Sequence, residues 1–298
     1  MPTVPGDAPA VSFDPATNAA ETAFFTPTMF GDFGPTLRFG SAALTPYISK
    51  IADDSSPRPL DRVYVNFNYY NNLGQVPPAG PAISGYVETI GFEKTFWDGN
   101  ASIGMRLPFL QLVGTGFNNS SVGDLSLSAK YAFINERDTV LSAGLSITVP
   151  TGPCATLPSG NTINPVFFQP FVGLLLNSDG AFLHGFSSIM IPTDSRDVTL
   201  WFNDIGVGYW LYRDCTNTRI ISAITPTFEV HVNTPLNNRY PGAANNPNVV
   251  PFADDVNLTM GATFFLGDTA TLGGAYCLPV TGPRPFCGEV ILQFNLRF

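Results

Sequence analysis

The last eleven residues, GEVILQFNLRF, alternate strictly between apolar and polar side chains. Because successive side chains of a strand point to opposite faces, this segment predicts a strand with one apolar and one polar face. Chain ends usually fray unless a neighbour holds them, so we expect another strand to pair with this one as far as Phe298. A half-buried strand of a soluble sandwich has the same alternation, and the pattern alone does not separate the two.

Eleven further segments show the same period of two between turn-forming residues. Their polar faces are rich in Ser, Thr, Gly and Asn rather than Lys and Glu. A sheet face exposed to bulk water would carry more charge, so we expect the polar faces to enclose a wet lumen. The twelve expected strands span residues 62–71, 83–95, 99–110, 121–135, 138–150, 166–177, 181–193, 198–213, 219–235, 254–267, 269–281 and 288–298.

Short and longer connections alternate between these segments. This alternation predicts an all-β fold, a 12-stranded antiparallel transmembrane β-barrel of the outer-membrane type, with both termini on the side of the short turns. In such a barrel the last strand closes against the first, which leaves no unpaired edge in lipid. The alternative is a soluble β-sandwich or a large soluble barrel. The short connections are 97–100, 135–138, 177–180, 213–219 and 267–268. The intervening ones are mostly longer, at 71–82, 111–120, 151–165 and 233–254, with shorter ones at 192–197 and 281–287.

Composition supports a chain whose exterior does not face water. Charged residues make up 12% of the chain, about half the usual share of a soluble domain. No apolar run of about 20 residues suits a spanning helix. The net charge of −9 disfavours nucleic acid as a partner, and two histidines with four cysteines lead us to expect no metal and no cofactor. Residues 1–20 lack a basic region and an apolar core, so we expect a mature chain without a signal peptide, in a bacterial outer membrane.

Two segments fit the alternation poorly. Glu88 shares its face with Ile90 and Phe92, and His184 shares its face with two phenylalanines. We predict a β-bulge or a shifted register at both places. Elsewhere the basic residues agree with the barrel, because Arg106 and Lys130 lie in mid-strand on the polar face, where they avoid the cost of about 2–4 kcal/mol for a cation facing lipid.

The chain divides into an N-terminal periplasmic or lumen-plugging segment, residues 1–60, and a transmembrane barrel, residues 61–298. The stretch AFFTPTMFGDFGP (23–35) is apolar and rich in Gly and Pro, which suits plugging better than spanning. A barrel of twelve strands has a narrow lumen. The charges expected there form either a constriction that orients a permeant or an internal network of ion pairs. These pore-lining candidates are Arg106, Asp124, Lys130, Asp204, Glu229, His231, Glu289 and Arg297.

Cys277 and Cys287 are placed symmetrically about Gly282, at the centre of the last expected hairpin. Directly opposed positions lie close enough for a disulfide, and an envelope compartment is oxidising. We therefore predict a Cys277–Cys287 disulfide. Cys154 falls in an outer loop and Cys215 in a turn at the opposite end, so these two are free or bond to another chain.

The aromatic C-terminus resembles the assembly signal of Gram-negative outer-membrane proteins, which implies contact with outer-membrane lipid and recognition of Phe298 by the barrel assembly machinery. The segments SVGDLSLSAKYAF (121–133), LSAGLSITVPTG (141–152), FQPFVGLLLN (168–177) and NDIGVGYWLYR (203–213) are similar to the barrel family named for the MetA pathway of phenol degradation. SKIADDSSPRPLDRVYVNFNYYNN (49–72) looks like a planctomycete-type branch. The resemblance covers about residues 45–298 and implies a barrel of the transporter type, without a substrate or catalytic residues.

From these observations we expect passive passage of small molecules, aromatic or apolar ones included, through a narrow lumen. The alternative is a structural barrel that anchors a partner in an envelope assembly, with a plugged lumen and the loop 233–255 as the partner's contact. We expect no enzyme. A hydrolase needs a nucleophile beside an oriented base. The one nearby pairing is His184 with Ser187 or Ser188, and strand alternation separates His184 from Ser187.

Overall fold

The computed structural model describes residues 26–32, 49–73, 83–156, 162–178, 180–214, 219–239, 254–282 and 284–298. Within these ranges the chain forms strands and no helix, and so contains no helix long and apolar enough to cross a membrane. The strands are β1 (Arg62–Leu73), β2 (Ile83–Phe96), β3 (Ala101–Gly114), β4 (Phe117–Val122), β5 (Leu125–Asn135), β6 (Thr139–Val149), β7 (Ala155–Thr156), β8 (Thr162–Ile163), β9 (Phe167–Asn177), β10 (Ala181–Pro192), β11 (Leu200–Tyr209), β12 (Tyr212–Arg213), β13 (Ile221–Pro235), β14 (Asp255–Leu266), β15 (Ala270–Pro279) and β16 (Gly288–Arg297).

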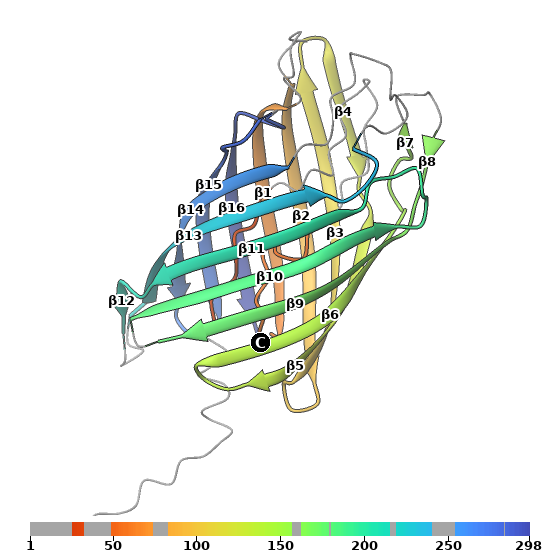
Figure 1. Ribbon diagram of the computed structural model, residues 1–298. Coiled ribbons are helices and arrows are strands. Elements are labelled where there is room, and N and C mark those ends of the chain that lie inside the picture. Colours follow the sequence, from red (N-terminus) through yellow and green to blue (C-terminus); the bar gives the residue numbers. More distant parts are fainter. Residues whose placement is uncertain are drawn as a thin grey trace, which may run out of the picture.

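Twelve of these strands close into one antiparallel barrel (Figure 1). Their order around the wall is β1, β2, β3, β5, β6, β9, β10, β11, β13, β14, β15 and β16. The wall closes where β16 pairs with β1, from Arg62 opposite Arg297 to Asn71 opposite Gly288. The prediction of a closed 12-stranded barrel is confirmed, and each expected segment overlaps one of these strands, although β1, β2 and β3 run past the expected ends.

The structure extends one hairpin beyond the prediction. Residues 111–120 were expected to form a loop, but β3 continues to Gly114 and β4 pairs back onto it. β3 changes partner at Pro108, from β5 to β4. Pro108 has no N–H to donate and its carbonyl accepts the N–H of Gly123 at 2.8 Å, which explains why a proline is tolerated at this junction.

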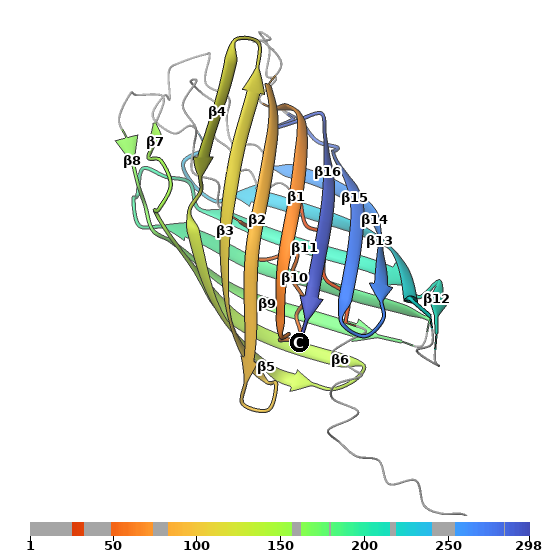
Figure 2. The same ribbon diagram turned by 180° about the vertical axis from the view of Figure 1, so that it is seen from behind.

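The two rims of the barrel differ as the connection lengths predict. β1 begins and β16 ends at the same rim (Figure 2), which we call the turn rim. The β2–β3 turn at this rim is so tight that Trp97, Asp98 and Gly99 have φ angles of 53°, 53° and 79°. The other rim, the loop rim, carries the longer connections, including that between β6 and β9.

The predicted bulges at Glu88 and His184 are wrong. β1 and β2 pair without a shift from Arg62 opposite Glu93 to Tyr70 opposite Gly85, so Glu88 points outward. β10 pairs with β11 without interruption, and His184 points inward with Phe182 and Phe186 on either side.

Those inward rings fit because each lies over a glycine on the neighbouring strand. Phe182 is paired with Gly208, where an added Cβ would lie 2.1 Å from the ring. A ring over a glycine covers backbone that would otherwise be bare, so these pairs pack the inner wall closely. The same arrangement joins Tyr64 to Gly91, Phe171 to Gly144, His184 to Gly206 and Phe186 to Gly173.

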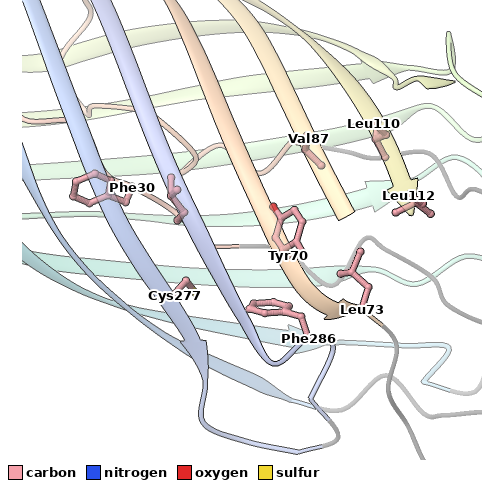
Figure 3. Packing of buried hydrophobic residues seen from close by; sticks show 9 residues of the cluster. Phe30, Tyr70, Leu73, Val87, Leu110, Leu112, Cys277 and Phe286 are labelled. Carbon is pink, nitrogen blue, oxygen red and sulfur yellow. The ribbon is translucent and has the colours of Figure 1, made fainter. Parts of the chain in front are cut away.

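Many inward-facing side chains of the described residues are buried, and some of them pack in apolar clusters. Near the loop rim an apolar cluster gathers Tyr70 of β1, Cys277 of β15, Phe286 of the β15–β16 connection and Phe30 of the N-terminal region (Figure 3). The interior therefore differs from the uniformly polar lumen that strand alternation predicts. It has a polar middle and apolar clusters, because several inward positions of β1, β2 and β3 carry Leu, Val or Tyr.

Candidate functional site

Two stretches of the N-terminal region, residues 26–32 and 49–60, run inside the barrel; we call them the inner segments (Figure 1). Their side chains are buried apart from the half-buried Asp53. The two stretches are joined by a hydrogen bond from the N–H of Met29 to the carbonyl of Ser55 at 2.8 Å. The charged side chains of the inner segments therefore have to find partners on the inner wall of the barrel.

The main partner is a patch built by three adjacent strands, which we call the acidic wall patch. In its middle row Asp204 of β11 is paired with His231 of β13, which is paired with Asn257 of β14. Since alternate residues of each strand point inward, the rows above and below face the lumen too. The patch consists of Phe202, Asp204, Gly206, Glu229, His231, Asn233, Asp255, Asn257 and Thr259.

The ammonium of Lys50 is seated on this patch. Lys50 Nζ donates to Asp204 Oδ1 at 2.6 Å, to Asn233 Oδ1 at 3.3 Å and to the carboxylate of Asp32. It lies 5.3 Å from the centre of the Phe202 ring, within range of a cation–π interaction. Burial alone would lower the pKa of Lys50, but the charges of Asp204 and Asp32 outweigh it and raise this pKa, so the amine stays protonated.

The backbone of the inner segments is held by the same patch. Glu229 accepts the N–H groups of Phe30 at 2.8 Å and Gly31 at 3.0 Å. Asp32 accepts hydrogen bonds from the side-chain amides of Asn233 at 2.8 Å and Asn257 at 2.7 Å. Burial raises the pKa of Asp32, yet Lys50 and His231 hold it well below its usual range. The contact between this part of the inner segments and the patch is thus polar and charged.

Both histidines of the chain approach Glu229. His231 Nε2 lies 3.2 Å from Glu229 Oε2, and His231 Nδ1 lies 2.8 Å from Asp204 Oδ1. His184 Nε2 lies 3.6 Å from Glu229 Oε1. Asp32, Asp204 and His231 together have the donor set of a divalent-metal site, but the ammonium of Lys50 bonds to both carboxylates and supplies the positive charge there.

A second network lies across the lumen, on strands β1, β2, β3 and β5. Glu93 accepts from Lys130 at 3.0 Å and from Arg62 at 3.1 Å, and Arg62 also pairs with Asp54 of the inner segments at 3.3 Å. Arg106 donates to the carbonyl of Lys50 at 2.8 Å. In the order around the wall β3 is six strands from β13 in either direction, so Arg62, Arg106 and Lys130 lie across the barrel from the acidic wall patch, with Glu93 as the wall carboxylate among them.

All eight predicted pore-lining residues are buried in the structure. Arg106, Lys130, Asp204, Glu229 and His231 belong to the two networks described above. Glu289 accepts from Asn68 at 2.6 Å, and Arg297 donates to the carbonyl of Thr26 at 2.6 Å. That these residues line a pore stays a prediction.

Asp124 has a more local contact than the prediction gives it. It lies between β4 and β5, where its carboxylate accepts the N–H of Gly152 at 2.8 Å. Thr151 donates to the carbonyl of Gly123 at 3.1 Å and accepts the N–H of Leu125 at 2.9 Å. These hydrogen bonds connect the bend between β4 and β5 to the residues that follow β6.

Sequence reasoning missed Asp32, Lys50, Asp54 and Glu93 as members of the networks. Glu93 carried a usable signal, because it shares strand parity with Thr89 and Gly91 on the inner face. The three residues of the inner segments lie outside any periodic pattern, so only the folded chain shows what they contact.

The predicted Cys277–Cys287 disulfide is wrong, because the hairpin has another register. Cys277 is paired with Glu289, two residues farther along β16 than the symmetric hairpin predicts. Phe286 turns inward onto Tyr70, with ring centres 5.7 Å apart. As a result Cys277 is a buried free thiol, and Cys287 is an exposed free thiol beside Asn72. Cys154 is free and exposed, and Cys215 lies outside the described residues.

His184 and Ser187 lie on opposite faces of β10, as strand alternation predicts. His184 is buried inside the barrel, whereas Ser187 lies on the outer face, where it donates to Asn203 at 2.8 Å and accepts from Trp201 at 3.1 Å. Ser188 points inward and accepts from Gln169 at 3.0 Å. His184 is therefore not hydrogen-bonded to either serine in the described structure.

Solved structures share this architecture. An outer membrane channel from Pseudomonas putida F1 superposes with a TM-score of 0.60 at 13% identity, over 80% of this chain and 96% of that one. This chain has the fold of that outer-membrane channel. The NanC porin superposes with a TM-score of 0.47 at 11% identity, over 79% of this chain and 98% of that one. LpxR from Salmonella typhimurium superposes with a TM-score of 0.49 at 8% identity, over 79% of this chain and 100% of that one. Both similarities are too distant to carry an argument.

No protein-family model matches the sequence, and neither does any curated protein. The resemblance to the barrel family named for the MetA pathway of phenol degradation therefore stays a prediction. At 13% identity the likeness to the channel from Pseudomonas putida F1 shows the fold alone.

Proposed function

We propose that this protein is an integral outer-membrane barrel that gives passive passage to small molecules, and that its inner segments control whether the lumen is open. The observation that carries the proposal is the contrast between the two sides of the wall. The outer side bears exposed apolar residues such as Ile103, Leu127, Val172 and Leu292, while the inner side bears charged residues arranged across a lumen. Such a wall suits lipid outside and polar contacts inside.

The contacts that hold the inner segments support a lumen that these segments can open and close, rather than one that they block permanently. Asp32, Lys50 and the N–H groups of residues 30 and 31 contact the wall through hydrogen bonds and ion pairs, which water and ions replace when the segments move. In this proposal residues 1–60 form a lumen-plugging segment and residues 61–298 form the barrel. The apolar cluster at the loop rim suits aromatic or apolar molecules among the permeants.

Two contacts outside the lumen belong to the same proposal. Phe298 is 62% exposed at the turn rim. Its ring stacks on that of Phe92, with ring centres 6.2 Å apart, and Lys94 Nζ lies 5.1 Å from the centre of the Phe298 ring. Its exposure leaves it accessible to the barrel assembly machinery, and the apolar outer face is the surface for membrane lipid.

Conductance of the purified chain in planar lipid bilayers tests the proposal. The Asp32→Ala variant removes the two amide contacts and one partner of Lys50, so we expect openings at least several times more frequent than in the wild type. Arg239→Ala is the control, since it breaks only an exposed ion pair with Asp254 at the loop rim. If the wild type and Asp32→Ala are both silent, passive passage is contradicted and the structural, anchoring barrel with a plugged lumen is supported instead.

A further inference from the structure

We propose that the acidic wall patch is a binding site for the primary ammonium group of a small amine, and that Lys50 is a tethered occupant which such an amine displaces. The inference rests on the proposed function and names the class of molecule that its lumen selects. The chain's own lysine shows the geometry, with carboxylate and amide oxygens of Asp204 and Asn233 around the nitrogen and the Phe202 ring beside it.

The patch offers more acceptors than the inner segments use. Asp204 Oδ2, Asp255 Oδ1 and Asn257 Oδ1 are buried and accept no hydrogen bond from any described residue. A buried acceptor without a donor costs free energy. These three oxygens lie in the same two rows of the patch as Asp204 and Asn233, which bind the ammonium group of Lys50. An ammonium group carries three donors and no acceptor, so it matches this surplus better than a carboxylate or a neutral alcohol.

The net negative charge of the acidic wall patch favours a cationic ligand. The patch carries three carboxylates, Asp204, Glu229 and Asp255, against the single histidine His231. Lys50 and Asp32 both belong to the inner segments and leave together when these segments move. The wall that remains is anionic, and an opposite charge is attracted more strongly inside a protein than in bulk water.

Apolar side chains also border the site, where they can contact the alkyl chain of an amine. Phe202 packs in an apolar cluster with Leu200, Met190, Val198 and Phe167 on the loop-rim side of the patch. A primary amine with a short alkyl body can therefore place its nitrogen where Lys50 Nζ lies and its carbons against the Phe202 ring, as the four-carbon stem of the lysine does.

Lys50 then acts as an intramolecular competitor. A group tethered by a short stretch of chain has an effective concentration in the millimolar range, so an external amine binds the wild type only weakly. Removing the tethered ammonium, with the wall left intact, should expose the site to the external amine.

The test uses the full chain in detergent and n-butylammonium as the probe, with n-butanol as its neutral isostere, and measures binding by titration calorimetry. We expect Lys50→Met, which keeps the stem but not the charge, to bind n-butylammonium about tenfold or more tightly than the wild type. Lys94→Met is the matched control, since Lys94 is half-exposed at the turn rim and pairs with Asp61. Adding Asp204→Asn to Lys50→Met should abolish the gain.

The inference is overturned if Lys50→Met binds n-butylammonium no better than n-butanol, or equally well with and without Asp204→Asn. Lys50→Ala serves as a second variant if Lys50→Met does not fold. Conductance separates the two proposals. Amine binding by a chain that never conducts would leave the site standing and contradict passage, whereas conductance without any preference for the amine would contradict the site alone.

Discussion

Gly208 shows how the side-chain packing of the inner wall depends on single residues. Its side of β11 faces the ring of Phe182 across the β10–β11 pair, and an added Cβ would lie 2.1 Å from that ring. Phe182 in turn packs against Trp210, with ring centres 5.6 Å apart. The ring cannot retreat without disturbing this cluster, so the position admits no side chain.

We therefore expect Gly208→Ala to destabilise the barrel by about 1–3 kcal/mol, the usual cost of overpacking a core. In a Phe182→Ala background the same substitution should cost little, because the clashing ring is gone. Urea unfolding in lipid vesicles measures both. Gly274→Ala is the control, since its nearest side-chain atom would lie 3.7 Å away. Equal costs for Gly208→Ala with and without Phe182 would refute the ring-over-glycine account.

At the scale of elements, the inner segments bring charged groups of both signs into the interior of the barrel. Asp53 illustrates the balance. Its Oδ2 accepts the N–H of Lys50 at 2.8 Å, while its buried Oδ1 accepts no hydrogen bond from the described residues. Burial raises the pKa of Asp53 to about 7, with Asp32 adding to the rise and Lys50 and Arg106 opposing it.

This raised pKa makes the docking of the inner segments pH-dependent. The folded chain binds a proton at Asp53 that the unfolded chain has released above its ordinary pKa of about 4, so stability falls as pH rises from about 4 to about 7. We expect the free energy of unfolding to drop by at least about 1 kcal/mol between pH 5 and pH 8. Asp53→Asn, which cannot ionise, should flatten that decline in urea titrations, and an unchanged slope would contradict the role of Asp53.

At the scale of the whole molecule, the wall is a boundary between two solvents. Val172 lies at the middle of β9 with its side chain 52% exposed on the outer face, next to neighbours on β6 and β10. Inward positions at similar depth, such as Ser142 and Ser188, are buried and polar. At this depth the barrel is thus apolar toward its surroundings and polar toward its own lumen.

If the surroundings are hydrocarbon, Val172→Lys should cost about 2–4 kcal/mol on folding into lipid vesicles, because a cation near the midplane is desolvated. Leu211→Lys, at the turn rim where the side chain is 65% exposed, should cost about 0–1 kcal/mol. Comparable costs at the two positions, or a chain that stays monodisperse without detergent, would show that the outer face does not lie in a membrane.

The sequence by itself determined the twelve strands of the wall, the faces of those that alternate clearly, and the closed barrel. Alternation is a local property, so LSLSAKYAF could be assigned to an inner and an outer face without knowing any contact. It also placed Arg106, Lys130, Asp204, Glu229 and His231 on the inner face, where the structure finds them buried.

Only the tertiary structure decided which charges meet and how the last hairpin is registered. Lys50 reaches Asp204 across 154 residues of chain, and no periodic pattern marks a segment that crosses a lumen instead of joining its wall. Cys277 opposes Glu289 rather than Cys287 because the loop turns Phe286 into the interior. Both outcomes depend on how side chains distant in sequence fill a common space, and that space exists only once the barrel has closed.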